Sequence, residues 1–186
     1  IVLGTIGIKL GDLVGAIFII LVGSALHFVF AWSGYWPPMA VVAPVNESVW
    51  EHLKLAFWPA LAFALIEYAA LRERANNYWV AKGVALFSMP ALIVALFYAY
   101  TAVAGDNVLA VDIVVFVVSV AVGQWISYRI LLARKARGLV GGLALVALVT
   151  MVAAFSLLSY YPPRLPLFRD SVTAQYGLLD AYPVSH

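Results

Sequence analysis

Apolar residues dominate five long runs of this chain, and polar residues gather in the short segments between them. The runs cover residues 12–33, 47–71, 80–104, 108–132 and 139–161. Each run is long enough to cross the hydrocarbon core of a bilayer, which takes about 20 helical residues. Lipid also favours helices, because it cannot hydrogen-bond to open backbone groups. The pattern therefore predicts an all-α integral membrane bundle of five transmembrane helices.

The composition agrees with a membrane location. The 186 residues have a mean hydropathy of +1.00 and only 11% charged side chains, whereas a soluble domain carries about 25%. The lipid bilayer is therefore the first expected partner. The absence of cysteine excludes disulfides, thiolate metal sites and cysteine nucleophiles. The net charge of +2 does not point to a nucleic-acid partner.

The end of the chain differs from the five runs. Pro162, Pro163 and Pro166 interrupt it after the fifth run, and the residues that follow are too polar for a sixth crossing. We expect a transmembrane domain over residues 1–161 and an ordered C-terminal tail over residues 162–186. The tail is rich in aromatic residues, proline and leucine, so we expect it to pack over the outer face of the bundle.

Basic residues are distributed unequally between the two ends of the predicted bundle. One end collects Lys9, Arg72, Arg74, Lys82, Arg129, Arg134, Lys135 and Arg137, and the other end only Lys54, Arg164 and Arg169. Cytoplasmic loops of membrane proteins carry the excess of lysine and arginine. We therefore expect a multi-pass protein of the cell membrane with a cytoplasmic N-terminus and an extracytoplasmic C-terminus.

The start of the second run concentrates ionisable residues in an apolar context. The segment Asn46-Glu47-Ser48-Val49-Trp50-Glu51-His52-Leu53-Lys54 holds two carboxylates, an imidazole and an ammonium. Such groups are expensive at membrane depth and are usually retained because they pair, bind an ion or move a proton. Helical spacing stacks Glu47, Glu51 and Lys54 along one stripe. Asn46 is well placed to cap this helix.

A second imidazole is expected at the same depth. His27 lies about 9 Å below the outer end of the first helix, and His52 lies about 7 Å below the start of the second, at a rise of about 1.5 Å per residue. Helices joined by a short loop are normally neighbours, so the two rings are expected to lie close together. Asp112 and Asp170 fall on the same side. The candidates are then His27, Glu47, Glu51, His52, Asp112 and Asp170.

Each candidate also has a simpler interpretation. Glu47 and Asp112 suit the first turns of helices, where negative charge is favourable. Lys54 can reach the interface or pair with Glu51. Asp170 has arginine neighbours in the tail, at positions 164 and 169.

Imidazoles and carboxylates together suit a divalent metal ion: zinc, manganese or iron. We expect His27, His52 and Glu51 as ligands, with Glu47, Glu51 and Asp170 as catalytic carboxylates. Water bound to such a metal attacks esters or amides near neutral pH. The resulting hypothesis is a metal-dependent hydrolase that acts on a lipid or another small molecule delivered by the membrane.

Other functions use the same residues. A haem between His27 and His52 is less favoured, because it would bury two carboxylates beside it. A proton or cation conduit would continue through Glu67 and Gln124. In an accessory or structural subunit, the cluster would orient the tail. Small residues such as the Gly11 and Gly15 pair serve helix packing inside the bundle or a homo-oligomer.

Several segments resemble a family of small multi-pass membrane proteins of bacteria and archaea that carries a domain-of-unknown-function label. They are Leu26-His27-Phe28, residues 44–54 with their Asn-Glu-Ser-x-Trp-Glu-His motif, Phe57-Trp58-Pro59, residues 166–170 and Tyr176-Gly177. The resemblance covers most of the chain and implies no activity. It does imply that the candidate residues belong to the family pattern.

Overall fold

The computed structural model describes residues 2–72, 75, 77–134 and 138–178. Three of the basic residues used to predict the orientation, Arg74, Lys135 and Arg137, lie outside the described residues. So do residues 179–186 of the expected tail.

Among the described residues, five helices are long and apolar enough to cross a membrane, so the predicted fold class is confirmed. They are α1 (Val2–Trp32), α2 (Val49–Leu71), α3 (Tyr78–Ala104), α4 (Leu109–Leu131) and α5 (Gly138–Leu157). Two short 3-10 helices, η1 (Pro37–Val41) and η2 (Pro166–Phe168), lie outside the bundle core. Helix α1 begins ten residues before the predicted start, and Asp12, which is paired inside the bundle, lies within it.

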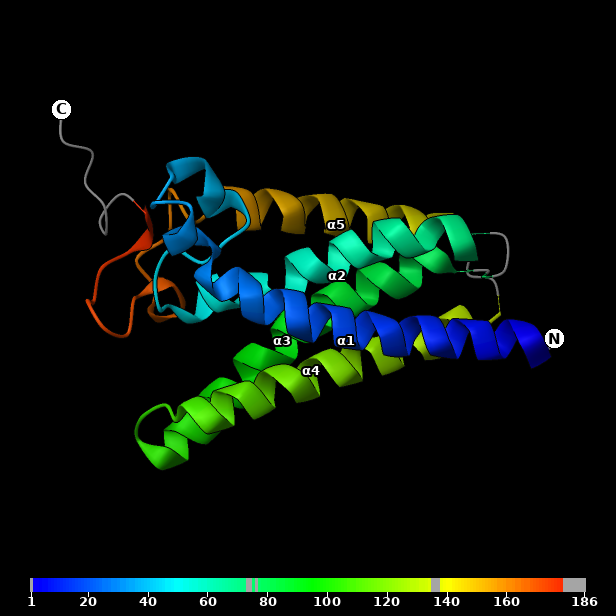
Figure 1. Ribbon diagram of the computed structural model, residues 1–186, viewed down its shortest axis with the longest axis horizontal. Coiled ribbons are helices and arrows are strands. Elements are labelled where there is room, and N and C mark those ends of the chain that lie inside the picture. The colour runs from blue at the N-terminus through cyan, green and yellow to red at the C-terminus, as the bar shows by residue number, and fades with distance from the viewer. Residues whose placement is uncertain (1, 73–74, 76, 135–137, 179–186) are drawn as a thin grey trace.

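The five helices lie side by side, with the N-terminus at one end and the C-terminal tail at the other (Figure 1). We call these the N-terminal end and the tail end. Helix α1 packs on α2 and α4, and α3 packs on α2, α4 and α5. Each helix contributes at least one fully buried side chain to the shared core: Ile19, Phe57, Met89, Val120 and Phe155. Most of α5 is exposed, as expected for a helix that faces lipid.

Glycine and proline shape the contact between α1 and α2. Pro59 lies inside α2, and a proline leaves the carbonyl four residues earlier without its helical hydrogen bond. That carbonyl belongs to Leu55, and an added Cβ at Gly23 of α1 would collide with its oxygen. Gly23 therefore lets α1 approach the open carbonyl closely, as small residues do between membrane helices.

Gly11 and Gly15 make room for side chains from other helices. A Cβ at Gly11 would meet the Glu67 carboxylate, and a Cβ at Gly15 would meet the Gln124 amide and the Phe63 ring. The glycine pair therefore packs inside the bundle, against α2 and α4.

Replacing Gly23 by valine is expected to destabilise the protein by about 1–3 kcal/mol, the usual cost of forcing extra atoms into a packed contact. The matched control is Gly142→Ala, where an added Cβ meets nothing within 4 Å. Unfolding in detergent, followed by tryptophan fluorescence, measures both. Equal stability of the two variants would contradict the close contact between α1 and α2.

Candidate metal centre

The chain enters α2 through a capped turn. Ser48 is the N-cap residue of α2, and its hydroxyl accepts a hydrogen bond from the Glu51 N–H at 3.3 Å. The Asn46 side-chain oxygen accepts from the Ser48 N–H at 3.0 Å. Asn46 therefore stabilises the turn before the helix. The residue that caps α2 is Ser48, and not Asn46 as predicted from the sequence. As a result Glu47 precedes α2 and is not on its helical stripe.

Three candidate side chains meet at the tail end of α1 and α2. Oxygen Oε2 of Glu47 lies 3.2 Å from Nε2 of His52, and its Oε1 lies 3.9 Å from Nε2 of His27. The two imidazole rings are 5.2 Å apart between centroids. One ligand atom from each of the three residues lies within 4.8 Å of the other two. We call this group the His/Glu cluster.

The orientation of the His52 ring is set by the backbone. Its Nδ1 lies 2.9 Å from the Ser48 carbonyl oxygen, and a carbonyl oxygen only accepts hydrogen bonds. Nδ1 therefore carries a proton, and Nε2 is the nitrogen that faces Glu47. Metal-binding histidines commonly donate their second N–H to a backbone carbonyl in this way.

The His/Glu cluster lies at the edge of the bundle. The side chain of Glu47 is 49% exposed, and each histidine is 32% exposed. The His27 ring contacts Phe28 edge to face, and Phe28 stacks on Trp32. Both of these aromatic rings are exposed. Exposed aromatic residues at a helix end are typical of the membrane–water interface, so the cluster is accessible from that level.

The two neighbouring imidazoles favour the charged form of Glu47. The hydrogen bond from His52 lowers the pKa of Glu47, burial opposes this by raising it, and the charges of both histidines lower it further. The carboxylate is therefore ionised and available as a ligand at neutral pH.

Glu51 does not join the His/Glu cluster. It forms a buried ion pair with Lys54, with Oε2 2.8 Å from Nζ, and both side chains are almost completely buried. Glu51 also accepts hydrogen bonds from the Val45 N–H at 3.0 Å and from the Ser159 hydroxyl at 2.6 Å. Lys54 donates to the carbonyls of Ala40 and Ala43 and to Ser159. We call Glu51, Lys54 and Ser159 the buried knot.

The buried knot joins three distant segments. Glu51 and Lys54 belong to the first turns of α2, Ser159 follows α5, and the bonded backbone groups of residues 40, 43 and 45 belong to the connection between α1 and α2. The polar atoms of Lys54 and Glu51 are thus fully bonded within the protein, and these bonds tie the three segments together.

The tail packs against the start of α2. The Trp50 ring lies between the rings of Phe155 and Phe168, at 4.7 and 4.8 Å. Ser171 donates to the Glu47 carbonyl at 3.1 Å, which places the tail beside the His/Glu cluster. Leu178 donates to the Ser159 carbonyl at 2.7 Å.

The two aspartates singled out from the sequence lie elsewhere. Asp170 is buried in the tail, where its carboxylate accepts from the Val172 N–H at 2.9 Å and from the Thr173 hydroxyl at 2.5 Å. Asp112 bonds to Tyr100 and Asn107 at the turn between α3 and α4. Neither carboxylate is brought to the histidines.

Sequence reasoning missed three residues that the structure makes important. Ser159 carried a weak signal, as a hydroxyl just before the proline pair. Asp12 stands at the start of the first predicted run and Lys82 near the start of the third, and the sequence pattern does not pair them, yet they form an ion pair at 3.0 Å. Their separation of 70 residues leaves no pattern that local spacing could reveal.

The fold and the site define a multi-pass helical membrane protein with a His/Glu cluster near one membrane surface. The chain belongs to a family of unknown function (DUF6512), whose model matches residues 9–178. The resemblance inferred from the sequence is thereby confirmed. No curated protein and no solved structure matches the chain significantly.

Replacing Lys54 by methionine is expected to lower stability by about 3–5 kcal/mol, because it leaves the Glu51 carboxylate buried without its counter-charge. The double variant Glu51→Gln/Lys54→Met buries no charge and should recover part of that loss. Thermal unfolding in detergent compares them with the wild type. A single variant as stable as the wild type would show that the ion pair is not what joins these segments.

The stability of the folded protein should include a contribution from the Glu47 carboxylate that is lost in acid. Its pKa in the folded protein lies below the ordinary value of 4.5, so its stabilising contribution is complete above that pH and is lost as the pH falls through the folded-state pKa. The half-exposed position limits the contribution to about 1 kcal/mol or less. Chelator-treated Glu47→Gln should lack this part of the pH dependence. An identical melting profile of the two proteins below neutral pH would contradict the His52–Glu47 interaction.

Proposed function

We propose that this protein holds a divalent transition metal ion in the His/Glu cluster, with His27, Glu47 and His52 as its ligands. One observation carries the proposal. The Nδ1–H of His52 is bonded to a carbonyl, and its Nε2 lies 3.2 Å from an ionised carboxylate. In a neutral ring Nε2 has only a lone pair to offer. An ionised carboxylate at that distance calls for a positive charge, which either a metal ion between the two atoms or a second proton on the His52 ring supplies.

The spacing supports zinc well. Zinc bonds to nitrogen and oxygen of about 2.0–2.2 Å in a tetrahedral site put neighbouring ligand atoms about 3.3 Å apart. The distance from His52 to Oε2 of Glu47 already agrees, but the 3.9 Å contact of His27 is made to the other oxygen, Oε1, and the three ligand atoms lie only within 4.8 Å of one another, so binding requires the side chains to move closer together. The partial exposure of all three side chains allows that movement. Two imidazoles and one carboxylate are also ligand types that suit manganese and iron.

Three protein ligands leave a coordination position open, which is typical of catalytic rather than structural zinc sites. A metal held there would supply a water molecule that ionises near neutral pH. We therefore propose hydrolysis of an ester or amide in a lipid or another membrane-delivered molecule, at the outer leaflet. Glu51 and Asp170 have no part in this proposal, because their oxygens are bonded to neighbouring groups. Glu47 is the remaining carboxylate at the cluster.

Metal analysis of the purified protein tests the proposal. We expect about one equivalent of metal after loading with zinc, manganese or iron and removal of excess. His27→Gln and His52→Gln should weaken binding at least about tenfold, as loss of a ligand does. The matched control is Asp112→Asn, which removes an acid from the same end of the bundle and should bind like the wild type. Equal metal content in all four proteins would overturn the proposal.

A structural role for the cluster is the second candidate, and the bond from Ser171 to the Glu47 carbonyl favours it. In that case a protonated His52 supplies the positive charge, and the cluster holds the tail against α2. The same variants distinguish the two. Under the structural role they lower the melting temperature of metal-free protein and leave metal content unchanged. Under the metal proposal, added zinc raises the melting temperature of the wild type but not of the histidine variants.

A further inference from the structure

A second ionic cluster lies toward the N-terminal end of the bundle, remote from the His/Glu cluster. The ammonium of Lys82 on α3 lies 3.0 Å from Oδ1 of Asp12 on α1 and 2.6 Å from Oε2 of Glu67 on α2. The Tyr78 hydroxyl shares its single hydrogen between the Ala64 carbonyl at 2.5 Å and Oε2 of Glu67 at 3.2 Å. All three charged residues are buried, with at most 7% of each exposed. We call Asp12, Glu67 and Lys82 the inner triad.

The inner triad is short of positive charge. Two carboxylates share a single ammonium, so the ionised group carries one excess negative charge within membrane-spanning helices. An uncompensated buried charge is strongly unfavourable. The other titratable groups around the triad include the exposed Lys9 on α1, which lines the same recess as Asp12, and the phenols of Tyr68, Tyr78 and Tyr128. A phenol is neutral at physiological pH and does not balance the charge.

Two oxygens of the inner triad also lack a hydrogen-bond donor. Among the described residues, nothing donates to Oδ2 of Asp12 or to Oε1 of Glu67, although both atoms are buried. Oε1 of Glu67 lies over Gly11, the residue next to Asp12. The buried Ser127 hydroxyl of α4 is close enough to influence the Asp12 carboxylate but makes no hydrogen bond within the usual distance, so a small side-chain movement would bring it to Asp12 as a donor. Unbonded buried oxygens are uncommon and call for a water, an ion or a proton.

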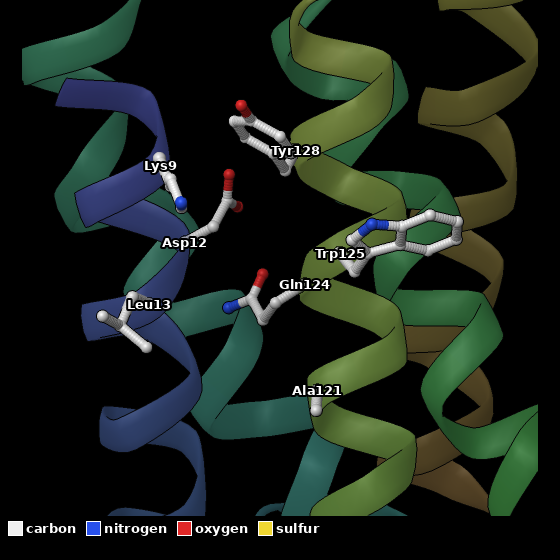
Figure 2. A pocket seen from close by; sticks show the side chains of 7 residues that line it. All are labelled: Lys9, Asp12, Leu13, Ala121, Gln124, Trp125 and Tyr128. Carbon is white, nitrogen blue, oxygen red and sulfur yellow. The ribbon is translucent and has the colours of Figure 1, made fainter. Parts of the chain in front are cut away.

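Asp12 faces an open recess. A cavity of about 390 Å³ lies between α1 and α4 and is lined by Lys9, Asp12, Leu13, Ala121, Gln124, Trp125 and Tyr128. Figure 2 shows Asp12 and Gln124 reaching toward each other's helices, with the Asp12 carboxylate between α1 and α4. Asp12 lines this recess, although its Oδ2 has almost no exposed surface, so an ion or a proton entering the recess reaches that oxygen after a small side-chain movement.

We propose that the inner triad binds one monovalent cation, either a proton or an alkali metal ion, on the carboxylates of Asp12 and Glu67. The bound cation balances the excess negative charge and engages the oxygens that have no donor. An anion is disfavoured, because the single buried ammonium is already shared by two carboxylates. The site is independent of the His/Glu cluster, since the two groups share no residue and lie toward opposite ends of the bundle.

The test compares the melting temperature of the protein in detergent across pH and in sodium, potassium or N-methylglucamine chloride at equal ionic strength. An alkali metal site predicts a higher melting temperature in sodium or potassium than in the bulky organic cation. A proton site predicts no difference between salts, and an infrared carbonyl band of a protonated carboxylic acid at neutral pH. Binding to the folded state raises stability in either case.

Asp12→Asn removes the excess charge and is the decisive variant. It should abolish the salt dependence or the infrared band, whichever the wild type shows, and it is expected to fold because asparagine can still accept from Lys82. Glu67→Gln serves as a second variant should Asp12→Asn fail to fold. Asp112→Asn is the matched control and should retain the full wild-type response.

Two results would overturn the proposal. The first is a wild-type protein with neither an alkali metal response nor a protonated carboxyl band. The second is a response that persists undiminished in both Asp12→Asn and Glu67→Gln. Because the readouts do not depend on transition metals, failure here leaves the proposed metal site unaffected, and loss of the metal site leaves this result unaffected.

Discussion

The ion pair between Glu51 and Lys54 is the constraint on which the tail end of this protein depends. Both side chains are almost completely buried, and such a pair is tolerable only when every remaining donor and acceptor is bonded. The carbonyls of Ala40 and Ala43, the Val45 N–H and the Ser159 hydroxyl meet that need. Satisfying one buried ion pair therefore folds the connection after α1 and the end of α5 onto the start of α2.

The structure separates the buried knot from the proposed metal ligands. The buried knot uses up Glu51 and Lys54, and the capped turn at Ser48 turns Glu47 away from them and toward the two histidines. Glu47, His27 and His52 remain partly exposed at the level of the exposed aromatic residues Phe28 and Trp32. A rigid base beneath a partly exposed ligand set is what a metal centre needs, because ligands held in place lose little freedom on binding. The inner triad is a second set of buried ionic contacts. In it, two carboxylates share one ammonium, whereas the buried knot has one of each.

Much of this could be predicted from the sequence. Hydropathy located five spans, and the depth of His27 and His52 on consecutive helices correctly brought their rings together. The different surroundings of the two glutamates could not be predicted: Glu47 faces the histidines, whereas Glu51 is buried against Lys54. Helical spacing put both on one stripe, but α2 begins at Val49, so Glu47 is free to point elsewhere. The pairing of Asp12 with Lys82 could not be predicted from local spacing either. The two residues are 70 positions apart in the sequence and meet only because α1 and α3 fold into one bundle.

The sequence by itself determined that this is a five-helix membrane protein with ionisable residues at two depths, since transfer of apolar side chains to lipid depends on composition and length alone. Tertiary structure decided which charges pair, which stay exposed and which lack a partner. Those outcomes depend on distances of a few ångströms between side chains from different helices. The electrostatic energy at low dielectric is steep at that range, and no periodicity along the chain encodes it.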